Sequence, residues 1–194
     1  GFLSPDHNGR SNRMSNEANL EANLQRGIDV IRGKVRKMAE LTESALNDGL
    51  RALFENDGQL AYSIILRDQQ IDEYEKEIDR LCLEFMVRQQ PAAGPLRFVY
   101  ATIKINQELE RIGDYAESVA RQGLLINSLD VDIDYSKFKA ISEISIPMLG
   151  NAVDAFLDQD ADAFDSEGFR SAIADAANVS VAQVDLAFSA GSVV

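Results

Sequence analysis

The stretch PAAGPLRFVYATIKINQELERIGDYAESV, residues 91–119, decides the fold predicted for this chain. It opens with two prolines around a glycine, which end one element and prepare another, since proline is favoured in the first turn of a helix. Apolar side chains then recur at helical spacing: Val99, Ile105, Leu109, Ile112, Ala116 and Val119. The pattern predicts a helix with Pro95 in its first turn that runs to about Ile126.

Two further long helices are predicted upstream. The first runs from about Leu20 to Phe54, and the second from about Gln59 to Gln89, with Asp57 placed to cap it. Their apolar faces contain Leu24, Ile28, Ile31, Val35 and Met38 in the first, and Ile64, Ile71, Tyr74, Ile78, Leu81 and Phe85 in the second. Three long helices joined by short breaks predict an antiparallel three-helix bundle over residues 20–128, and an all-α fold class.

The flanking segments are assigned from composition and pattern. Residues 1–19 begin with a run rich in Gly, Ser and Asn and are expected to be disordered. Residues 135–163 are expected to contain a fourth helix, from Ser136 to about Asp158. Residues 164–194 form an atypical tail, because a strand-like alternation from Val181 to Phe188 has no partner strand in a helical bundle.

Charge and composition exclude several classes of function. The chain has 194 residues and a formal net charge of −13, which argues against binding nucleic acid, since phosphate neutralisation needs basic patches. One cysteine, Cys82, excludes an internal disulfide and a cysteine-rich zinc site, and its apolar surroundings predict a buried side chain. No apolar run reaches about 18 residues, so no insertion into a membrane is expected.

Acidic side chains repeat at a spacing of four on two of the predicted helices. Asp68 and Asp72 form one pair, and Glu110 and Asp114 form the other. Residues at i and i+4 share one face of a helix, so each pair presents two carboxylates in one direction. Glu75 and Asp79 continue the first pair along its helix. Where two antiparallel helices meet near the surface, the four carboxylates of the two pairs can lie opposite one another.

Two interpretations of these acids stay open from the residues alone. Like charges at this spacing repel, and a hard or borderline cation held by carboxylate oxygens would offset the repulsion. The alternative is a pair of solvated acidic faces with Arg67, Arg80 and Arg111 as local ion-pair partners. Binding of metal separates the two interpretations.

The run from Arg97 to Ala116, with Glu110-Arg-Ile-Gly-Asp114 near its end, resembles the third-helix motif of PhoU repeats. The upstream run Asp68-Gln-Gln-Ile-Asp72 is similar to the second-helix motif of that family. Together they cover about Leu20 to Ser128 in the correct order. Gly113 fits the motif because a side chain there would crowd a neighbouring helix. Family members normally have two such repeats, so residues 135–163 resemble the first helix of a truncated second repeat.

The resemblance implies a regulator of phosphate uptake and phosphate-starvation signalling rather than an enzyme. It implies a cytoplasmic protein that docks on a phosphate ABC transporter and a sensor histidine kinase, and it is compatible with a homo-oligomer. By position it makes Asp68, Asp72, Glu110 and Asp114 ligands of divalent or trivalent metal ions, with iron, zinc, manganese and magnesium as candidates. The resemblance assigns no catalytic residue.

The residue content argues against two classes of enzyme. A di-iron carboxylate oxidoreductase needs Glu-x-x-His on two helices, and serine or cysteine hydrolysis needs a histidine base. The single histidine is His7, in the segment expected to be disordered, which argues against both enzymes. A metal-free helical adaptor is the alternative that remains.

Overall fold

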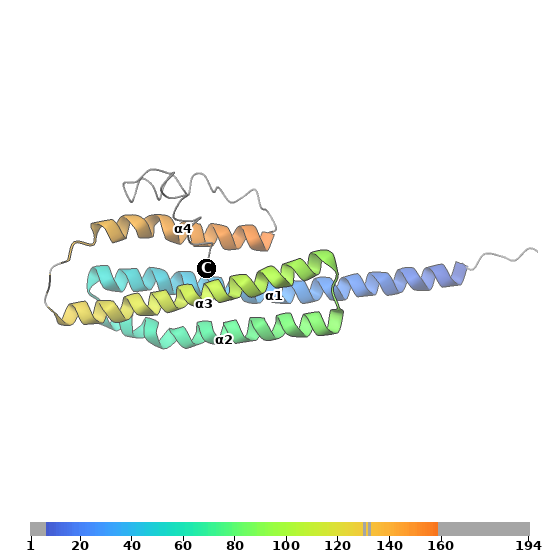
Figure 1. Ribbon diagram of the computed structural model, residues 1–194, viewed down its shortest axis with the longest axis horizontal. Coiled ribbons are helices and arrows are strands. Elements are labelled where there is room, and N and C mark those ends of the chain that lie inside the picture. Colours follow the sequence, from blue (N-terminus) through green and yellow to red (C-terminus); the bar gives the residue numbers. More distant parts are fainter. Residues whose placement is uncertain (1–6, 130, 132, 159–194) are drawn as a thin grey trace, which may run out of the picture.

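The computed structural model describes residues 7–129, 131 and 133–158, and all regular structure within these ranges is helical. The helices are α1 (His7–Glu55), α2 (Gly58–Gln89), α3 (Ala93–Ser128) and α4 (Ser136–Asp158). Figure 1 shows α1, α2 and α3 as an up-down-up bundle, with α4 lying along α1 on the side away from α2. The predicted all-α fold, with a fourth helix added to a three-helix bundle, is confirmed.

One expected boundary is wrong. Helix α1 begins at His7, whereas disorder was expected up to residue 19 and a helix from about Leu20. Figure 1 shows its N-terminal part running beyond the ends of α2 and α3. The early residues carry no apolar periodicity, so the pattern gave no helical signal there. A helix that is already nucleated extends by one hydrogen bond per added residue, without needing a packed face.

The breaks between the helices follow the chemistry of their residues. Asn56 has a φ of 62°, in the left-handed region that asparagine tolerates well, and it separates α1 from α2. The carboxylate of Asp57 then accepts a hydrogen bond from the backbone N–H of Leu60 at 3.0 Å, which is the predicted cap of α2. At the other break, Pro95 lies in the first turn of α3, as expected.

The core lies between the three long helices. The buried apolar side chains of α1 to α3 that pack there are Ile28, Ile31, Val35, Met38, Ala39, Ala45, Ala52, Ala61, Ile64, Ile71, Ile78, Cys82, Phe85, Phe98, Val99, Leu109, Ala116 and Ala120. The predicted burial of Cys82 is confirmed. The face of α3 is rotated slightly from the expected one, because Ile105, Ile112 and Val119 are only half-buried while the polar Thr102 and Asn106 are fully buried.

Glycines allow two close approaches between helices. A Cβ built on Gly113 of α3 would lie 3.0 Å from Cδ1 of Ile71 on α2, so the crowding predicted for this position is confirmed. A Cβ on Gly49 of α1 would lie 3.1 Å from the backbone oxygen of Ala116 on α3. These contacts bring the helix backbones close together, and they fix how α3 faces α2.

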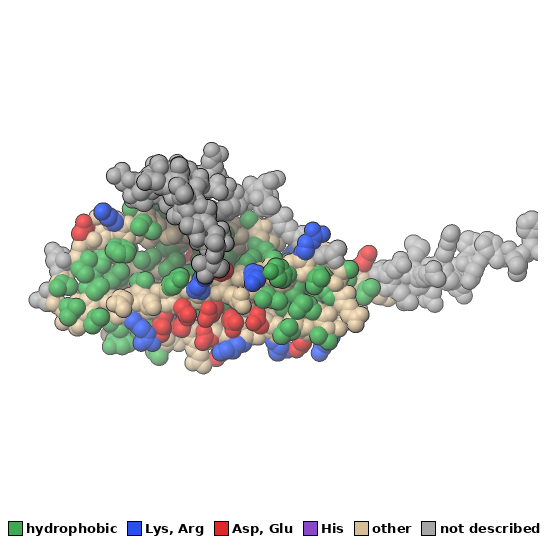
Figure 2. All heavy atoms as spheres, viewed as in Figure 1, with side chains coloured by type: hydrophobic (Ala, Val, Ile, Leu, Met, Phe, Trp, Pro, Cys, Tyr) green, Lys and Arg blue, Asp and Glu red, His purple; other side chains and the backbone are tan. Residues whose placement is uncertain are grey.

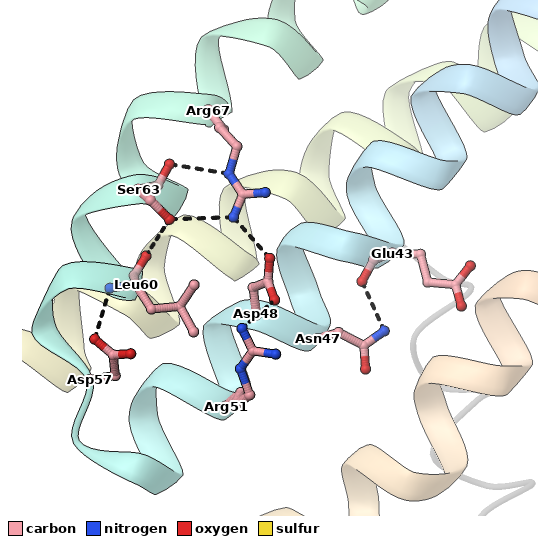
Figure 3. A network of polar contacts seen from close by, with 8 residues as sticks. All are labelled: Glu43, Asn47, Asp48, Arg51, Asp57, Leu60, Ser63 and Arg67. Atoms are coloured by element: carbon pink, nitrogen blue, oxygen red, sulfur yellow. Dashed lines mark hydrogen bonds and ion pairs between the residues drawn. The ribbon is translucent and has the colours of Figure 1, made fainter.

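Polar contacts join α1 to α2 at one end of the bundle, as Figure 3 shows. The guanidinium of Arg67 on α2 donates to the carboxylate of Asp48 on α1 at 2.9 Å and contacts the hydroxyl of Ser63. Asp48 also forms an ion pair with Arg51 at 3.2 Å. Arg67 is therefore engaged with α1.

Helix α4 has the expected bounds and packs against α1. Arg36 of α1 forms ion pairs with Asp154 and Asp158 at 3.1 and 3.6 Å, and Phe156 stacks on Phe98 of α3 at 5.5 Å between ring centroids. The expected tail, residues 164–194, lies outside the described residues, as do residues 159–163 of the segment assigned to a truncated second repeat. The division of the chain into these segments stays a prediction.

Candidate metal centre

Carboxylates gather where α2 and α3 face each other. We define the acidic stripe as Asp68, Asp72, Glu75 and Asp79 on α2 with Glu110, Asp114 and Glu117 on α3. Figure 2 shows acidic side chains gathered over the middle of the α2 and α3 face, with apolar and basic side chains on either side. The i,i+4 spacing turns the carboxylates of each helix toward the same boundary, as the sequence predicted.

The pKa of Asp68 is raised by acids of both helices. Its side chain is half-buried, and this burial raises the pKa of its carboxyl above the ordinary value. The negative charges of Glu117, Asp72 and Asp114 raise that pKa further, while Arg121 opposes them. Since Glu117 and Asp114 belong to α3, the acids of the two helices lie close enough to act on each other across the boundary.

The pKa of Glu110, on α3, is likewise raised by acids of both helices. Burial raises the pKa of Glu110, followed by the charges of Asp114, Glu75, Asp72 and Asp68 in that order. All four of the predicted ligands, Asp68, Asp72, Glu110 and Asp114, therefore contribute to one negative electrostatic environment. Glu75 raises the pKa of Glu110 more than Asp72 or Asp68 does, so Glu75 is the acid of α2 that acts most strongly on Glu110.

The acids of the stripe do not form a coordination site in the described structure. Within residues 7–129, 131 and 133–158, no group of three or more His, Cys, Asp or Glu side chains is arranged to hold a metal ion. The predicted ligands share one surface without converging on one point. Asp68, Asp72 and Glu110 are half-buried and Asp114 is exposed, so their carboxylates keep the freedom to turn.

The arginines named as alternative partners of the acids make other contacts. Arg67 pairs with Asp48, Arg80 pairs with Glu84 at 2.6 Å, and Arg111 pairs with Glu108. In the described part of the chain, no ion pair involves any of the four predicted ligands. Their mutual repulsion is therefore not offset by the local ion pairs that a simple solvated face would use.

Asn106 is a residue of this site that the sequence interpretation missed. It is fully buried on α3, and its Nδ2 donates to Oδ1 of Asp79 at 3.0 Å and to the backbone oxygen of Glu75 at 2.9 Å. Its own Oδ1 is buried without a hydrogen-bond partner among the described residues. The sequence does contain a signal for the burial of Asn106. It lies three residues before Leu109 and seven after Val99, which is the spacing of the core residues of α3.

The donor chemistry of the stripe suits a hard cation. All its side chains offer carboxylate oxygens, the ligands that magnesium, manganese and iron prefer, while softer metals prefer sulfur or imidazole. Cys82 is not available as a ligand, because burial and the charge of Asp79 raise the pKa of its thiol to about 12. The residues present therefore fit an ion held by oxygen atoms alone.

Comparisons with known proteins agree with the motifs. The family model described as PhoU domain matches residues 35–123, which include every residue of the acidic stripe. The chain is 33% identical over 137 residues to the phosphate-specific transport system accessory protein PhoU homolog of Aquifex aeolicus, and 32% identical over 152 residues to that of Pseudomonas putida. These matches cover 71% and 78% of this chain, but 62% and 59% of the relatives. The chain thus spans less than two thirds of their length.

A solved structure gives the same family. The crystal structure of PhoU from Pseudomonas aeruginosa superposes with a TM-score of 0.69 at 33% sequence identity. The match covers 72% of this chain and 67% of that chain. Both the arrangement of the helices and the sequence that forms them are therefore shared.

Proposed function

This chain belongs to the PhoU family, and we propose that it regulates phosphate uptake and phosphate-starvation signalling. The observation that carries the proposal is the acidic stripe, which lies inside the region that matches the family. The relatives from Aquifex aeolicus and Pseudomonas putida are described as accessory proteins of a phosphate-specific transport system. By this proposal the chain works in the cytoplasm by docking on other proteins, and it catalyses no reaction.

The acidic stripe serves in this role as a metal site. Asp68, Asp72, Glu110 and Asp114 are the proposed ligands, and iron, zinc, manganese and magnesium are the candidate ions. A bound cation would supply positive charge that neutralises the stripe. Three findings support the proposal: burial and mutual repulsion raise the pKa values of Asp68 and Glu110, the donors are all oxygen, and no ion pair in the described ranges offsets their charge.

Partner docking is the second element of the proposal. A phosphate ABC transporter and a sensor histidine kinase are the proposed partners, and oligomers of the chain itself are compatible with the role. No helix in the described ranges has the length and apolar character needed to cross a lipid bilayer. The chain would therefore reach a membrane transporter through contacts with the transporter's own subunits.

Regulation is tested in a bacterium that lacks its own homologous accessory protein. A reporter gene induced by phosphate starvation is expected to be active in that strain even in phosphate-rich medium, and expression of this chain should restore repression. A matched control expresses the Ile78→Asp variant, which places a charge in the core at a side chain that is 0% exposed. A reporter that stays active although the parent chain accumulates as a folded protein would contradict the proposed regulation.

Metal binding is tested separately on the purified protein. Elemental analysis is expected to find a transition metal or magnesium in the parent and less of it in the Asp114→Asn variant, whose side chain keeps its size but loses its charge. An equal metal content in both would move the site away from the acidic stripe. No bound metal in the parent after incubation with the candidate ions would contradict the metal site.

A metal-free helical adaptor is the second candidate, and one observation favours it. No three acidic, histidine or cysteine side chains in the described ranges are arranged to hold an ion. In that case the acidic stripe would itself be a docking surface for a basic patch on a partner. The two candidates differ in one measurement: bound metal in the parent that falls in the Asp114→Asn variant favours the metal site, and a parent that restores repression without binding any of the candidate ions favours the adaptor.

A further inference from the structure

A groove lies between α1, the start of α3 and the end of α4. It has a volume of about 700 Å³. Its lining is mostly apolar and includes Ile28, Pro95, Phe98, Ala101 and Phe156, with Arg97 among them. We call it the α1–α3–α4 groove. Its α3 residues precede the acids that α3 contributes to the acidic stripe.

One arginine of this groove, Arg97, lacks an acidic partner in the described part of the chain. Arg97 is exposed and takes part in no ion pair there. Nearby on α1, the guanidinium of Arg32 lies 5.2 Å from the centroid of the Phe98 ring and pairs with Asp29 at 4.0 Å, while its Nε is buried without a hydrogen-bond partner among the described residues. The groove thus offers aromatic surface together with positive charge, a combination that fits an acidic segment with an aromatic anchor.

Such a segment begins next to the groove. Helix α4 ends at Asp158, two residues after Phe156, and the chain continues to Val194. Residues 159–170 read QDADAFDSEGFR and carry four acids against one arginine, with Phe164 in the middle of the acids. An extended chain spans about 3.3 Å per residue, so Phe164 can reach about 20 Å from Asp158. The groove wall at Phe156 lies well within that distance.

We propose that residues 159–170 occupy the α1–α3–α4 groove, with Phe164 inserted between Phe98 and Ala101 and the neighbouring aspartates facing Arg97. The segment is covalently attached beside the groove, which gives it an effective local concentration in the millimolar range. A separate molecule would need an affinity that matches this advantage in order to compete. The chain's own continuation is therefore the favoured occupant over a second copy or a free anion.

Tryptophan fluorescence tests the docking directly, because the chain contains no tryptophan. A Phe164→Trp variant of the full chain carries its only indole in the proposed anchor. We expect a blue-shifted emission maximum and several-fold weaker quenching by acrylamide than in a Tyr100→Trp variant, whose position on α3 is 64% exposed. Helical circular dichroism equal to the parent's checks that both variants keep the bundle.

Charge reversal at the groove provides a second test of the docking. Arg97→Glu added to Phe164→Trp should raise the quenching toward the exposed reference, whereas Arg111→Glu, an exposed arginine further along α3, should leave it unchanged. Equal quenching of the indoles at 164 and 100 in folded protein would overturn the proposal, and so would shielding that survives Arg97→Glu. Shielding that is lost on dilution would assign the groove to a second copy and overturn it as well.

Discussion

The carboxamide of Asn106 on α3 donates a hydrogen bond to the carboxylate of Asp79 on α2, with 3.0 Å between Nδ2 and Oδ1. This is a contact between a fully buried amide and an acid of the acidic stripe. A second hydrogen bond from the same nitrogen to the backbone of Glu75 fixes the amide against α2. Asn106 therefore links the packed interior of the bundle to the charged surface of its proposed site.

The Asn106→Asp variant tests this link. The change keeps the shape of the side chain but removes the donor and buries a negative charge next to Asp79, so we expect a loss of more than about 3 kcal/mol in unfolding free energy. Gln107→Glu, the same chemical change at the exposed neighbouring position, should alter it by less than about 0.5 kcal/mol. Urea denaturation measures both. Similar midpoints for the two variants would show that Asn106 is not held as described.

Truncation of the core tests the assignment of the helix faces. Ile78 and Leu109 are 0% and 1% exposed, so replacing either with alanine should cost roughly 2–5 kcal/mol. Leu83→Ala on α2 is the matched control, because Leu83 is 58% exposed and its truncation should cost less than about 0.5 kcal/mol. Chemical denaturation of the three variants compares them. Denaturation midpoints of Ile78→Ala and Leu109→Ala that equal the parent's would contradict the packing.

Replacing glycine with alanine should change the stability of the protein in opposite directions at an exposed and at a buried position. Gly33 is exposed and a Cβ there would meet nothing within 4 Å, so Gly33→Ala should stabilise the protein by about 0.5–1 kcal/mol through helix propensity. Gly113→Ala gains the same propensity but forces a Cβ to about 3 Å from two carbons of the buried Ile71, and it should destabilise. Melting temperatures give the signs. A stabilising Gly113→Ala would mean that α2 and α3 can separate slightly without cost.

The sequence predicted the helices well because burial imposes a period that the residues reveal. Ile64, Ile71, Ile78 and Phe85 repeat every seven residues and are all buried on α2. The early start of α1 at His7 could not be predicted in the same way, since a helix that protrudes from a bundle needs no apolar face. Local hydrogen bonding, rather than packing, determines that part of the chain.

The sequence predicted the acidic stripe less completely than it predicted the helices. The i,i+4 spacing placed Asp68, Asp72, Glu110 and Asp114 on one surface, and their effects on the pKa values of Asp68 and Glu110 agree with that placement. Spacing on each helix does not determine the register between the helices. Only the packed structure shows that Glu75 is the α2 acid with the largest effect on the pKa of Glu110.

The raised pKa values predict an unusual dependence of stability on pH. Asp68, Glu75 and Glu110 all have pKa values raised by burial and by neighbouring acids. A carboxyl whose pKa is higher in the folded state binds its proton more readily there, so folding is favoured as pH falls through the raised pKa toward the ordinary value of about 4. In the presence of EDTA, we expect the urea midpoint to rise between pH 7 and about pH 5.

A triple variant provides the control for this pH dependence. Asp68→Asn, Glu75→Gln and Glu110→Gln together remove the three titrating groups and keep their size, so the midpoint should change much less over the same range. A parent midpoint that falls steadily from pH 7 to pH 5 would show that the acids do not repel one another enough to matter.

Added metal should reverse the effect of that repulsion. Manganese, iron, zinc or magnesium at pH 7 is expected to raise the melting temperature of the parent, because an ion that binds only the folded state stabilises it by mass action. The gain should fade as pH falls toward about 4, where the carboxylates become protonated. Asp72→Asn and Asp114→Asn should respond less to the ion, while Glu73→Gln, an exposed acid on the outer face of α2, should respond as the parent does.

The same variants without metal separate the two candidate functions. Each should melt slightly higher than the parent in EDTA, because removing one charge from a repelling set relieves the others. If the variants melt higher and the parent's melting temperature does not respond to any of the four ions, the acidic stripe acts only through its charge. The repulsion would then be retained for a basic partner surface, since an uncompensated cost at Asp68 and Glu110 needs some positive group to offset it. That result would favour the metal-free adaptor.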